Sequence, residues 1–246
     1  MTSLAVLGIH AFTMGLAHTR SLEEEQGGLV TDRPDFTESS FTILPGRLQI
    51  ESGFTQEWTA SSSRSFSAPE LLLRIGMAKN LEARFGLPNY GWAREGALSE
   101  EGFGATYLGF KLQLGPLGGG WDSALIPAIT FPARSGSESA TPELKAVWAT
   151  AVGAYSLTGM TAASWPEAGA MEWLQTVSLG IPIASRLGAF VEGVAGVSRS
   201  SRPAYTLHGG FVYQPDRSTQ WDFHIGAGLS PAAPRVFLGA GYSIGF

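Results

Sequence analysis

Apolar and polar side chains alternate along the chain, most clearly near the C-terminus. From Val236 to Phe246 every second residue is apolar or aromatic, and the residues between are mostly small. In residues 221–229, Trp221 and Phe223 alternate with Asp222 in the same way. Successive side chains of a strand point to opposite faces, so both segments are predicted strands with one apolar face. Their length matches the 9–11 residues with which a β-barrel strand crosses a membrane, rather than the ~5–6 residues of an average strand.

The same alternation upstream predicts further strands that carry their charges on one parity. In residues 81–87, for example, Leu81 and Phe85 oppose Glu82 and Arg84. A Lys or Arg facing lipid at the bilayer midplane costs about 2–4 kcal/mol, so the charged parity is predicted to face a lumen. The facing of the alanine-rich strands between residues 121 and 165 stays open. The predicted strands are 47–58, 70–75, 81–87, 104–114, 121–132, 143–155, 158–165, 170–182, 186–197, 203–213, 221–229 and 235–246.

The predicted connections alternate between short and long. Membrane barrels have short periplasmic turns and longer external loops. We therefore expect an all-β fold over residues 46–246, a transmembrane antiparallel up-and-down β-barrel of about twelve strands with its termini in the periplasm. A soluble β-sandwich or lipocalin-like barrel would also alternate. Short connections are expected at 78–80, 115–120, 156–157, 183–185 and 214–218, long ones at 59–65, 91–102, 133–142 and 198–202, with 166–169 and 230–233 as exceptions.

Composition supports the membrane barrel. Charged residues make up 15% of the 246 residues, below the ~25% of soluble domains, and 32 glycines disfavour a helical fold. The formal net charge of −5 gives no support for nucleic-acid binding. The chain has no cysteine, so disulfides and thiolate zinc sites are excluded. We predict no cofactor and no metal.

The N-terminus is predicted to lie outside the barrel wall. Residues 4–17 are mostly apolar and end in a small-x-small pattern, which predicts a signal peptide over residues 1–17. A short hydrophobic leader or a mis-chosen start is the alternative. Residues 18–45 are then a periplasmic segment or a plug inside the lumen. A plug would place Asp32, Arg33, Asp35 and Glu38 in the lumen, with Asp32 and Asp35 pairing with Arg74, Arg84 or Lys111; otherwise the segment is a periplasmic strap or an assembly site.

Charges on the inner parity come from four consecutive predicted strands and would lie on one side of the lumen. They predict a constriction that filters solutes by charge and size. The competing interpretation is a structural network of ion pairs that fills the interior, and both can hold together. The candidate filter residues are Glu51, Glu70, Arg74, Glu82, Arg84 and Lys111, with Glu57 on the same parity.

A catalytic barrel is the competing class of function. The predicted barrel contains two histidines, His208 and His224, and Asp222 shares a strand face with His224, so it could orient that ring. The sequence contains neither a GxSxG elbow nor an HExxH helix. We therefore predict no catalytic residue, and a lumen-facing histidine with an ordinary hydrogen bond.

Several segments resemble one family of outer-membrane transporters, that of the meta-pathway of phenol degradation. LVTDRPDFTES at residues 29–39 is similar to that family's motif near the mature N-terminus, and GRLQIESGFTQEW at 46–58 resembles its first strand. YLGFKLQL at 107–114, ALIPAITFP at 124–132, AFVEGVAG at 189–196 and the closing FLGAGYSIGF also match. Ala133 and Arg134 replace the usual Thr-Gly, which weakens inference about that loop's ligand.

The resemblance implies an outer-membrane β-barrel of a Gram-negative bacterium that takes up aromatic compounds. We expect passive uptake of a small, aromatic or hydrophobic solute, with outer-membrane lipids and the barrel-assembly machinery as partners. A terminal Phe246 with Tyr242 is the type of signal that this machinery reads. The alternatives are a structural or sensory envelope barrel without transport, or an outer-membrane enzyme with its site at the rim.

Overall fold

The described part of the chain consists of β-strands and the connections between them. The structure is a computed structural model that describes residues 29–59, 63–133, 139–167, 169–199 and 201–246. The predicted signal peptide lies outside the described residues. The strands are β1 (Leu48–Trp58), β2 (Arg64–Ala78), β3 (Leu81–Leu87), β4 (Tyr90–Glu95), β5 (Leu98–Phe103), β6 (Thr106–Gly118), β7 (Trp121–Phe131), β8 (Thr141–Val152), β9 (Tyr155–Ser164), β10 (Glu172–Ala184), β11 (Leu187–Ser198), β12 (Ala204–Tyr213), β13 (Thr219–Gly228) and β14 (Val236–Gly245).

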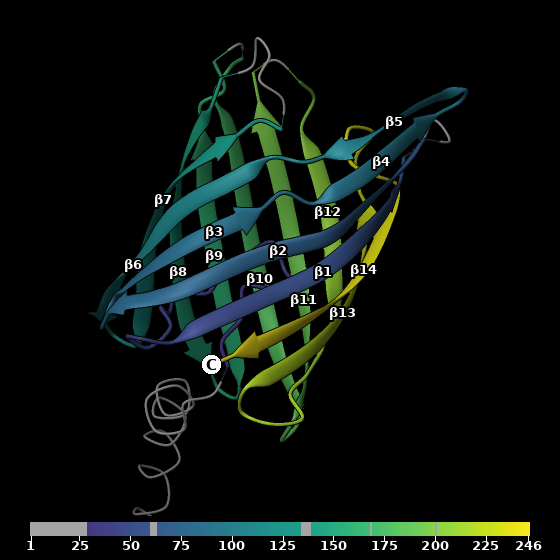
Figure 1. The fold of residues 1–246 in the computed structure, drawn as a ribbon. Coiled ribbons are helices and arrows are strands. Elements are labelled where there is room, and N and C mark those ends of the chain that lie inside the picture. The colour runs from purple at the N-terminus through teal and green to yellow at the C-terminus, as the bar shows by residue number, and fades with distance from the viewer. Residues whose placement is uncertain (1–28, 60–62, 134–138, 168, 200) are drawn as a thin grey trace, which may run out of the picture.

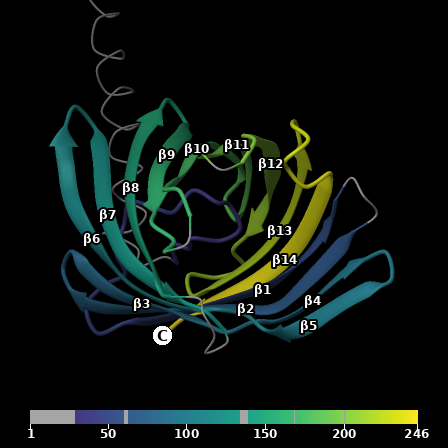
Figure 2. The same cartoon turned by 90° about the horizontal axis from the view of Figure 1, so that it is seen from above.

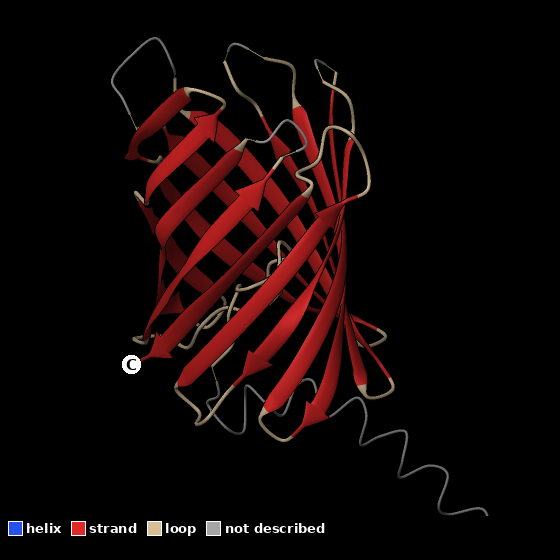
Figure 3. Cartoon of the chain, turned by 90° about the vertical axis from the view of Figure 1, so that its right-hand side faces the viewer, coloured by secondary structure: helices blue, strands red, loops and turns tan. Residues whose placement is uncertain are grey.

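All strands form one antiparallel sheet that closes on itself (Figures 1 and 3). β1 pairs with β2 on one side and with the last strand, β14, on the other, from Gln49 opposite Gly245 to Trp58 opposite Val236. Closure leaves no free edge in the barrel wall, as a membrane requires. β2 pairs with β3 along one half and with β4 along the other. β3 and β4 therefore act as one spanning strand, as do β5 and β6, and the closed barrel has twelve strands, as predicted.

The hairpin of β4 and β5 corrects the sequence analysis, which predicted a loop at 91–102. A tight turn at Gly96, with a φ of +59° that suits glycine, joins the two strands. β5 pairs only with β4, so the hairpin extends beyond the other strands (Figure 1). The acidic residues of this segment are typical of a loop. Pairing of β4 with β2, and of β5 with β4, stabilises the two strands. Two predicted connections are also misplaced, because β6 continues to Gly118 and β9 already begins at Tyr155.

The two faces of the barrel differ as the alternation predicts. Outward side chains such as Phe211, Trp221 and Ile225 are exposed to the surroundings, as lipid-facing residues are. Inward charges such as Glu51, Arg74 and Lys111 are fully buried. The alanine-rich strands, whose facing was open, put an apolar cluster inside: Ala124, Ile126, Val147, Met160 and Ala162.

Residues 29–44 join no strand and lie inside the ring of strands, where Figure 2 shows them in purple. We call this stretch the lumen segment. A turn at Gly46, with a φ of +77°, connects it to β1. The described part of the chain contains no helix long and apolar enough to cross a membrane.

Candidate functional site

The lumen segment folds back on itself as a loop. The backbone amide of Ser39 donates a hydrogen bond of 2.7 Å to Asp32 Oδ1, so the two arms of the loop are tied together. Phe36 and Thr37 lie at the tip, between these two residues. The loop therefore presents side chains in two directions, toward two different parts of the barrel wall.

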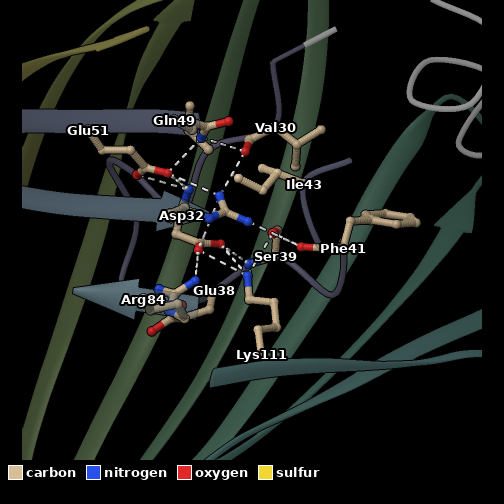
Figure 4. Close-up of polar contacts among 12 residues, drawn as sticks. Val30, Asp32, Glu38, Ser39, Phe41, Ile43, Gln49, Glu51, Arg84 and Lys111 are labelled. Atoms are coloured by element: carbon tan, nitrogen blue, oxygen red, sulfur yellow. Dashed lines mark hydrogen bonds and ion pairs between the residues drawn. The ribbon is translucent and has the colours of Figure 1, made fainter. Parts of the chain in front are cut away.

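One part of the wall is basic, and we call it the basic side: Arg74 (β2), Arg84 (β3), Lys111 (β6) and Lys145 (β8). Its cations converge on Asp32 and Glu38 of the lumen segment (Figure 4). Lys111 Nζ lies 2.9 Å from both carboxylate oxygens of Asp32, and Arg74 Nη1 lies 3.3 Å from Asp32 Oδ2. Arg84 bonds both Asp32 and Glu38, and Lys145 Nζ lies 2.7 Å from Glu38 Oε1. The structure thus places Asp32 against all three cations predicted for it.

Two wall carboxylates complete the basic side. Glu82 lies 2.8 Å from both Arg74 and Arg84, and Glu51 lies 3.0 Å from Arg74. Both also accept backbone amides of the lumen segment, Glu51 from Asp32 and Glu82 from Ile43. Among the described residues, four cations therefore meet four buried carboxylates, of which the lumen segment supplies two. Removing the segment would leave two uncompensated positive charges, which is costly in a buried site.

The cations of the basic side lower the pKa values of Asp32 and Glu38. Burial alone would raise the pKa of Asp32, but Arg74, Lys111 and Arg84 together hold this pKa well below its usual value. Burial likewise opposes ionisation of Glu38, and Arg84 with Lys145 still lowers its pKa. Both carboxyls therefore remain charged at neutral pH and keep the segment attached to the basic side.

The tip of the lumen segment contacts a different part of the wall, which we call the histidine side: Glu192 (β11), His208 (β12) and His224 (β13). The backbone amides of Phe36 and Thr37 donate to Glu192 at 3.0 and 2.7 Å. Glu192 also pairs with His208 Nδ1 at 2.8 Å, and His208 Nε2 lies 3.0 Å from His224 Nδ1. With Nδ1 of His208 donating to the carboxylate, its Nε2 accepts from His224. The Phe36 ring packs edge-on against His208, 5.2 Å between centroids.

Asp35 lies on the histidine side, so its predicted pairing with Arg74, Arg84 or Lys111 is wrong. It accepts a hydrogen bond from Ser178 and adjoins Glu192. Burial and then the charge of Glu192 raise the pKa of Asp35 well above its usual value. The sequence could not separate Asp32 from Asp35, because the reversal of the loop that points them apart depends on tertiary contacts.

Arg33 occupies a recess in the wall that glycines leave open. Its guanidinium lies 3.1 Å from Glu70 and 3.4 Å from Asp222. A Cβ at Gly53 would lie 2.2 Å from Arg33 Nη2, and one at Gly241 would lie 2.4 Å from its Nε. The recess therefore needs glycine at both positions for the side chain to enter.

The predicted pairing of Asp222 with His224 is not what the structure shows. Asp222 faces Arg33, whereas His224 bonds His208. Among the described residues, no group of three or more His, Asp or Glu side chains is arranged to hold a metal ion.

The predicted filter residues lie together on adjacent strands, as expected. Glu51, Arg74, Glu82, Arg84 and Lys111 belong to the basic side or contact it directly, while Glu70 pairs with Arg33. All of them are engaged with the lumen segment or with one another. Whether they filter solutes stays a prediction.

Three residues that hold the lumen segment against the wall were not predicted from the sequence: Thr37, Lys145 and Glu192. Thr37 donates to Glu192 and lies 2.6 Å from Thr176, but a single Thr carries no sequence signal. Lys145 is one of only three lysines, and Glu192 is the charged residue on the inner parity of its strand, so scarcity and parity could have singled them out.

A cavity of about 490 Å³ opens below the lumen segment at the end of the barrel that holds the C-terminus. Apolar side chains of the lumen segment line it, including Leu29, Phe41 and Ile43. Arg47, Lys79 and Arg217 also contribute. Its volume is in the range of pockets for small organic ligands.

The predicted assembly signal lies at the barrel seam. Phe246 exchanges backbone hydrogen bonds with Leu48 of β1, and its side chain is exposed. Tyr242 packs on Trp221, 4.6 Å between ring centroids. Recognition of these residues by an assembly machinery stays a prediction.

Comparison with solved structures defines the class of protein. An outer membrane channel from Pseudomonas putida F1 is similar with a TM-score of 0.67 at 11% identity, covering 88% of this chain and 100% of the other. The KdgM porin is similar with a TM-score of 0.55 at 12% identity, covering 80% of this chain and 99% of the other. At such identities the likeness shows the fold, which is that of an outer-membrane β-barrel.

The family follows from the sequence itself. Residues 31–246 match the family model described as "Putative MetA-pathway of phenol degradation", and the chain belongs to this family. The resemblance noted on the short motifs is thereby confirmed. No curated protein matches the chain in sequence.

Proposed function

We propose that this protein is a channel in the outer membrane of a Gram-negative bacterium for passive uptake of small, aromatic or hydrophobic solutes, with the lumen segment as its plug. The observation that carries the proposal is that a segment belonging to no strand fills the lumen. Its described contacts with the wall are made through side chains rather than through strand pairing, so it can shift without breaking the strand ladder. The lumen segment would then gate the passage.

The lining of the interior supports an apolar solute. The cavity of about 490 Å³ has room for a small aromatic molecule beside Leu29, Phe41 and Ile43. The inward faces of β7 to β9 also carry an apolar cluster that includes Ile126 and Met160. A solute with little charge would not have to displace the ion pairs of the basic side.

The comparisons support the same proposal. The family description names phenol degradation, and the similar structure from Pseudomonas putida F1 is described as an outer membrane channel. Passive passage needs no catalytic group. The histidines, which were the candidates for catalysis, contact Glu192, Phe36 and each other.

Single-channel conductance of the refolded barrel in a planar bilayer tests the proposal. We expect rare, small openings of the wild type and steady ohmic steps when residues 31–39 are replaced by a Gly-Ser linker of equal length. Glu82→Gln should shift ion selectivity toward anions, because it removes a lumen carboxylate. A small aromatic alcohol should produce blocking events that a sugar of similar size does not.

Folding of each variant is checked by heat-modifiable migration. If wild type and linker variant are both folded and both silent, the barrel is not a channel, and a structural or sensory role replaces the proposal. If both conduct equally, the lumen segment is not a plug.

A further inference from the structure

Two arginines face each other on the outside of the barrel, at the end away from the C-terminus. Arg64 of β2 is directly opposite Arg94 of β4, and both side chains are exposed. Their guanidinium carbons lie 5.7 and 5.2 Å from the centroid of the Trp92 ring, which they share. Among the described residues, neither makes an ion pair with a carboxylate within 4.0 Å.

This pairing costs stability as it stands. Like charges directly opposite each other across two strands are destabilising, and the shared contact with one indole ring offsets this in part. Glu101 lies opposite Trp92 on β5 without forming such an ion pair. An anion between the two guanidinium groups would remove the repulsion.

The aromatic residues below the arginines are on the lipid side. Thr55 bonds Glu70, which contacts Arg33 in the lumen, so the adjacent Phe54 points outward. Phe54 lies 6.0 Å from Phe66, and Phe66 stacks on Trp92 at 6.1 Å between centroids. The cluster is thus amphipathic, with cations at its upper end and aromatic rings toward the membrane.

The height of this cluster in the membrane matches the headgroups of the leaflet at the barrel end away from the C-terminus. β2 spans 15 residues from Ala78, at the same end as the C-terminus, to Arg64. At a rise of ~3.3 Å per residue and a tilt of ~35–45°, Arg64 lies roughly 33–38 Å above Ala78. The apolar band of such barrels is ~25 Å tall, so the two guanidinium groups reach the layer of lipid phosphates.

We propose that Arg64, Arg94 and Trp92 bind the phosphate of a phosphorylated glycolipid of the outer leaflet, whose acyl chains lie along Phe66 and Phe54. Guanidinium groups bind phosphate through paired N–H donors, and two together match the charge of a phosphomonoester. The site rests on the outer-membrane location and is independent of any solute that passes through the barrel.

Native mass spectrometry of the full barrel in detergent, titrated with bis-phosphorylated lipid A, tests the proposal. Arg64→Gln/Arg94→Gln should weaken binding at least tenfold, and removal of the lipid's phosphates should weaken binding to the wild type equally. The control is Arg186→Gln, which removes an exposed arginine from the opposite end and should leave lipid binding at the wild-type level. Glu101→Gln should tighten binding, because it removes a like charge beside the phosphate.

The outcomes separate the possibilities. Equal binding by wild type and the Arg64/Arg94 variant, with both folded by heat-modifiable migration, overturns the site. Full competition by millimolar inorganic phosphate would also overturn it, because a site for free phosphate needs no lipid. If the barrel conducts no current but the wild type still binds the lipid more tightly than the Arg64/Arg94 variant, the lipid site is supported and the channel proposal fails.

Discussion

The basic side and the histidine side of the lumen hold the same loop by different means. On the basic side, the main contacts are ion pairs of Asp32 and Glu38 with cations, which depend on the identity of these two side chains. On the histidine side, Glu192 accepts two backbone amides, which residues of almost any type could supply. The difference teaches that contacts made by charged side chains can be predicted from the sequence, whereas contacts made by backbone amides cannot.

The two sides also differ in what they would tolerate. The basic side is a connected network in which Arg84 serves Asp32, Glu38 and Glu82 at once. The histidine side is a chain of hydrogen bonds from the loop tip through Glu192 to His208 and His224. Loss of a shared cation leaves several buried carboxylates without one of their partners. Loss of one hydrogen-bond acceptor leaves fewer charged groups unpaired.

The largest expected effect comes from Arg84→Met. It removes the cation that contacts Asp32, Glu38 and Glu82 at once. Removing one member of a buried ion pair costs about 3–5 kcal/mol. We expect the urea midpoint of unfolding in lipid vesicles to fall and hydrogen exchange in residues 29–44 to quicken. Arg186→Met, in an exposed turn, is the matched control and should change neither.

A double-mutant cycle sharpens this result. Asp32→Asn and Arg84→Met should be strongly coupled, whereas Asp35→Asn and Arg84→Met should add within about 0.5 kcal/mol, because they lie on different sides of the loop. Equal coupling for both aspartates would contradict the separation of the two sides.

An intermediate effect is expected for Glu192→Gln. The amide keeps one acceptor oxygen but loses the charge that receives Phe36, Thr37 and His208, at a cost of about 1–3 kcal/mol. Exchange protection should fall at the tip of the loop and remain near Asp32. If protection falls equally along residues 29–44, the two sides do not act separately. Glu172→Gln, at an exposed strand end, serves as the control.

A smaller effect is expected for Gly53→Ala. The three atoms nearest to the new methyl group all belong to the guanidinium of Arg33, the end of a flexible side chain, which the methyl group would expel from its recess. The ion pairs of Arg33 with the partly exposed Glu70 and the buried Asp222 are then lost, and because the contact with Asp222 is long, at 3.4 Å, we expect a cost of about 1 kcal/mol. Arg33→Ala should have the same effect on the unfolding midpoint, and combining the two changes should add nothing further. An additive double variant would show that Arg33 does not occupy the recess.

The smallest effect concerns the pH dependence of the histidine side. The pKa of Asp35 is raised by burial and by Glu192, so the folded loop holds a proton that the free chain loses near pH 4. The contribution of Asp35 to stability therefore falls as pH rises from about 4 through its raised pKa. Asp35→Asn should flatten this part of the profile of urea midpoint against pH. Glu172→Gln, at an exposed strand end, is the control, and an unchanged slope in Asp35→Asn would contradict the assignment.

The hairpin of β4 and β5 shows where local pattern fails. Residues 91–102 contain Glu95, Glu100 and Glu101 and read as a polar loop, yet they form paired strands. Pairing of Phe66 with Trp92 across β2 and β4 supplies the stabilisation, and this contact joins residues 26 positions apart. Alternation of apolar and polar residues arises where one face of a strand is buried. A hairpin that extends beyond the lumen has no buried face, so its sequence does not alternate.

The sequence by itself determined the barrel, its even number of spanning strands and the inward position of its charges, because a period of two and the exclusion of charge from lipid are local constraints. It also offered Asp32 and Asp35 alike as partners of Arg74, Arg84 or Lys111, should the segment enter the lumen. Only the tertiary structure decided that Asp35 turns to the opposite wall, that Glu192 receives the loop tip and that glycines leave a recess for Arg33. These contacts join residues up to 207 positions apart, and they depend on how the loop reverses inside a closed sheet.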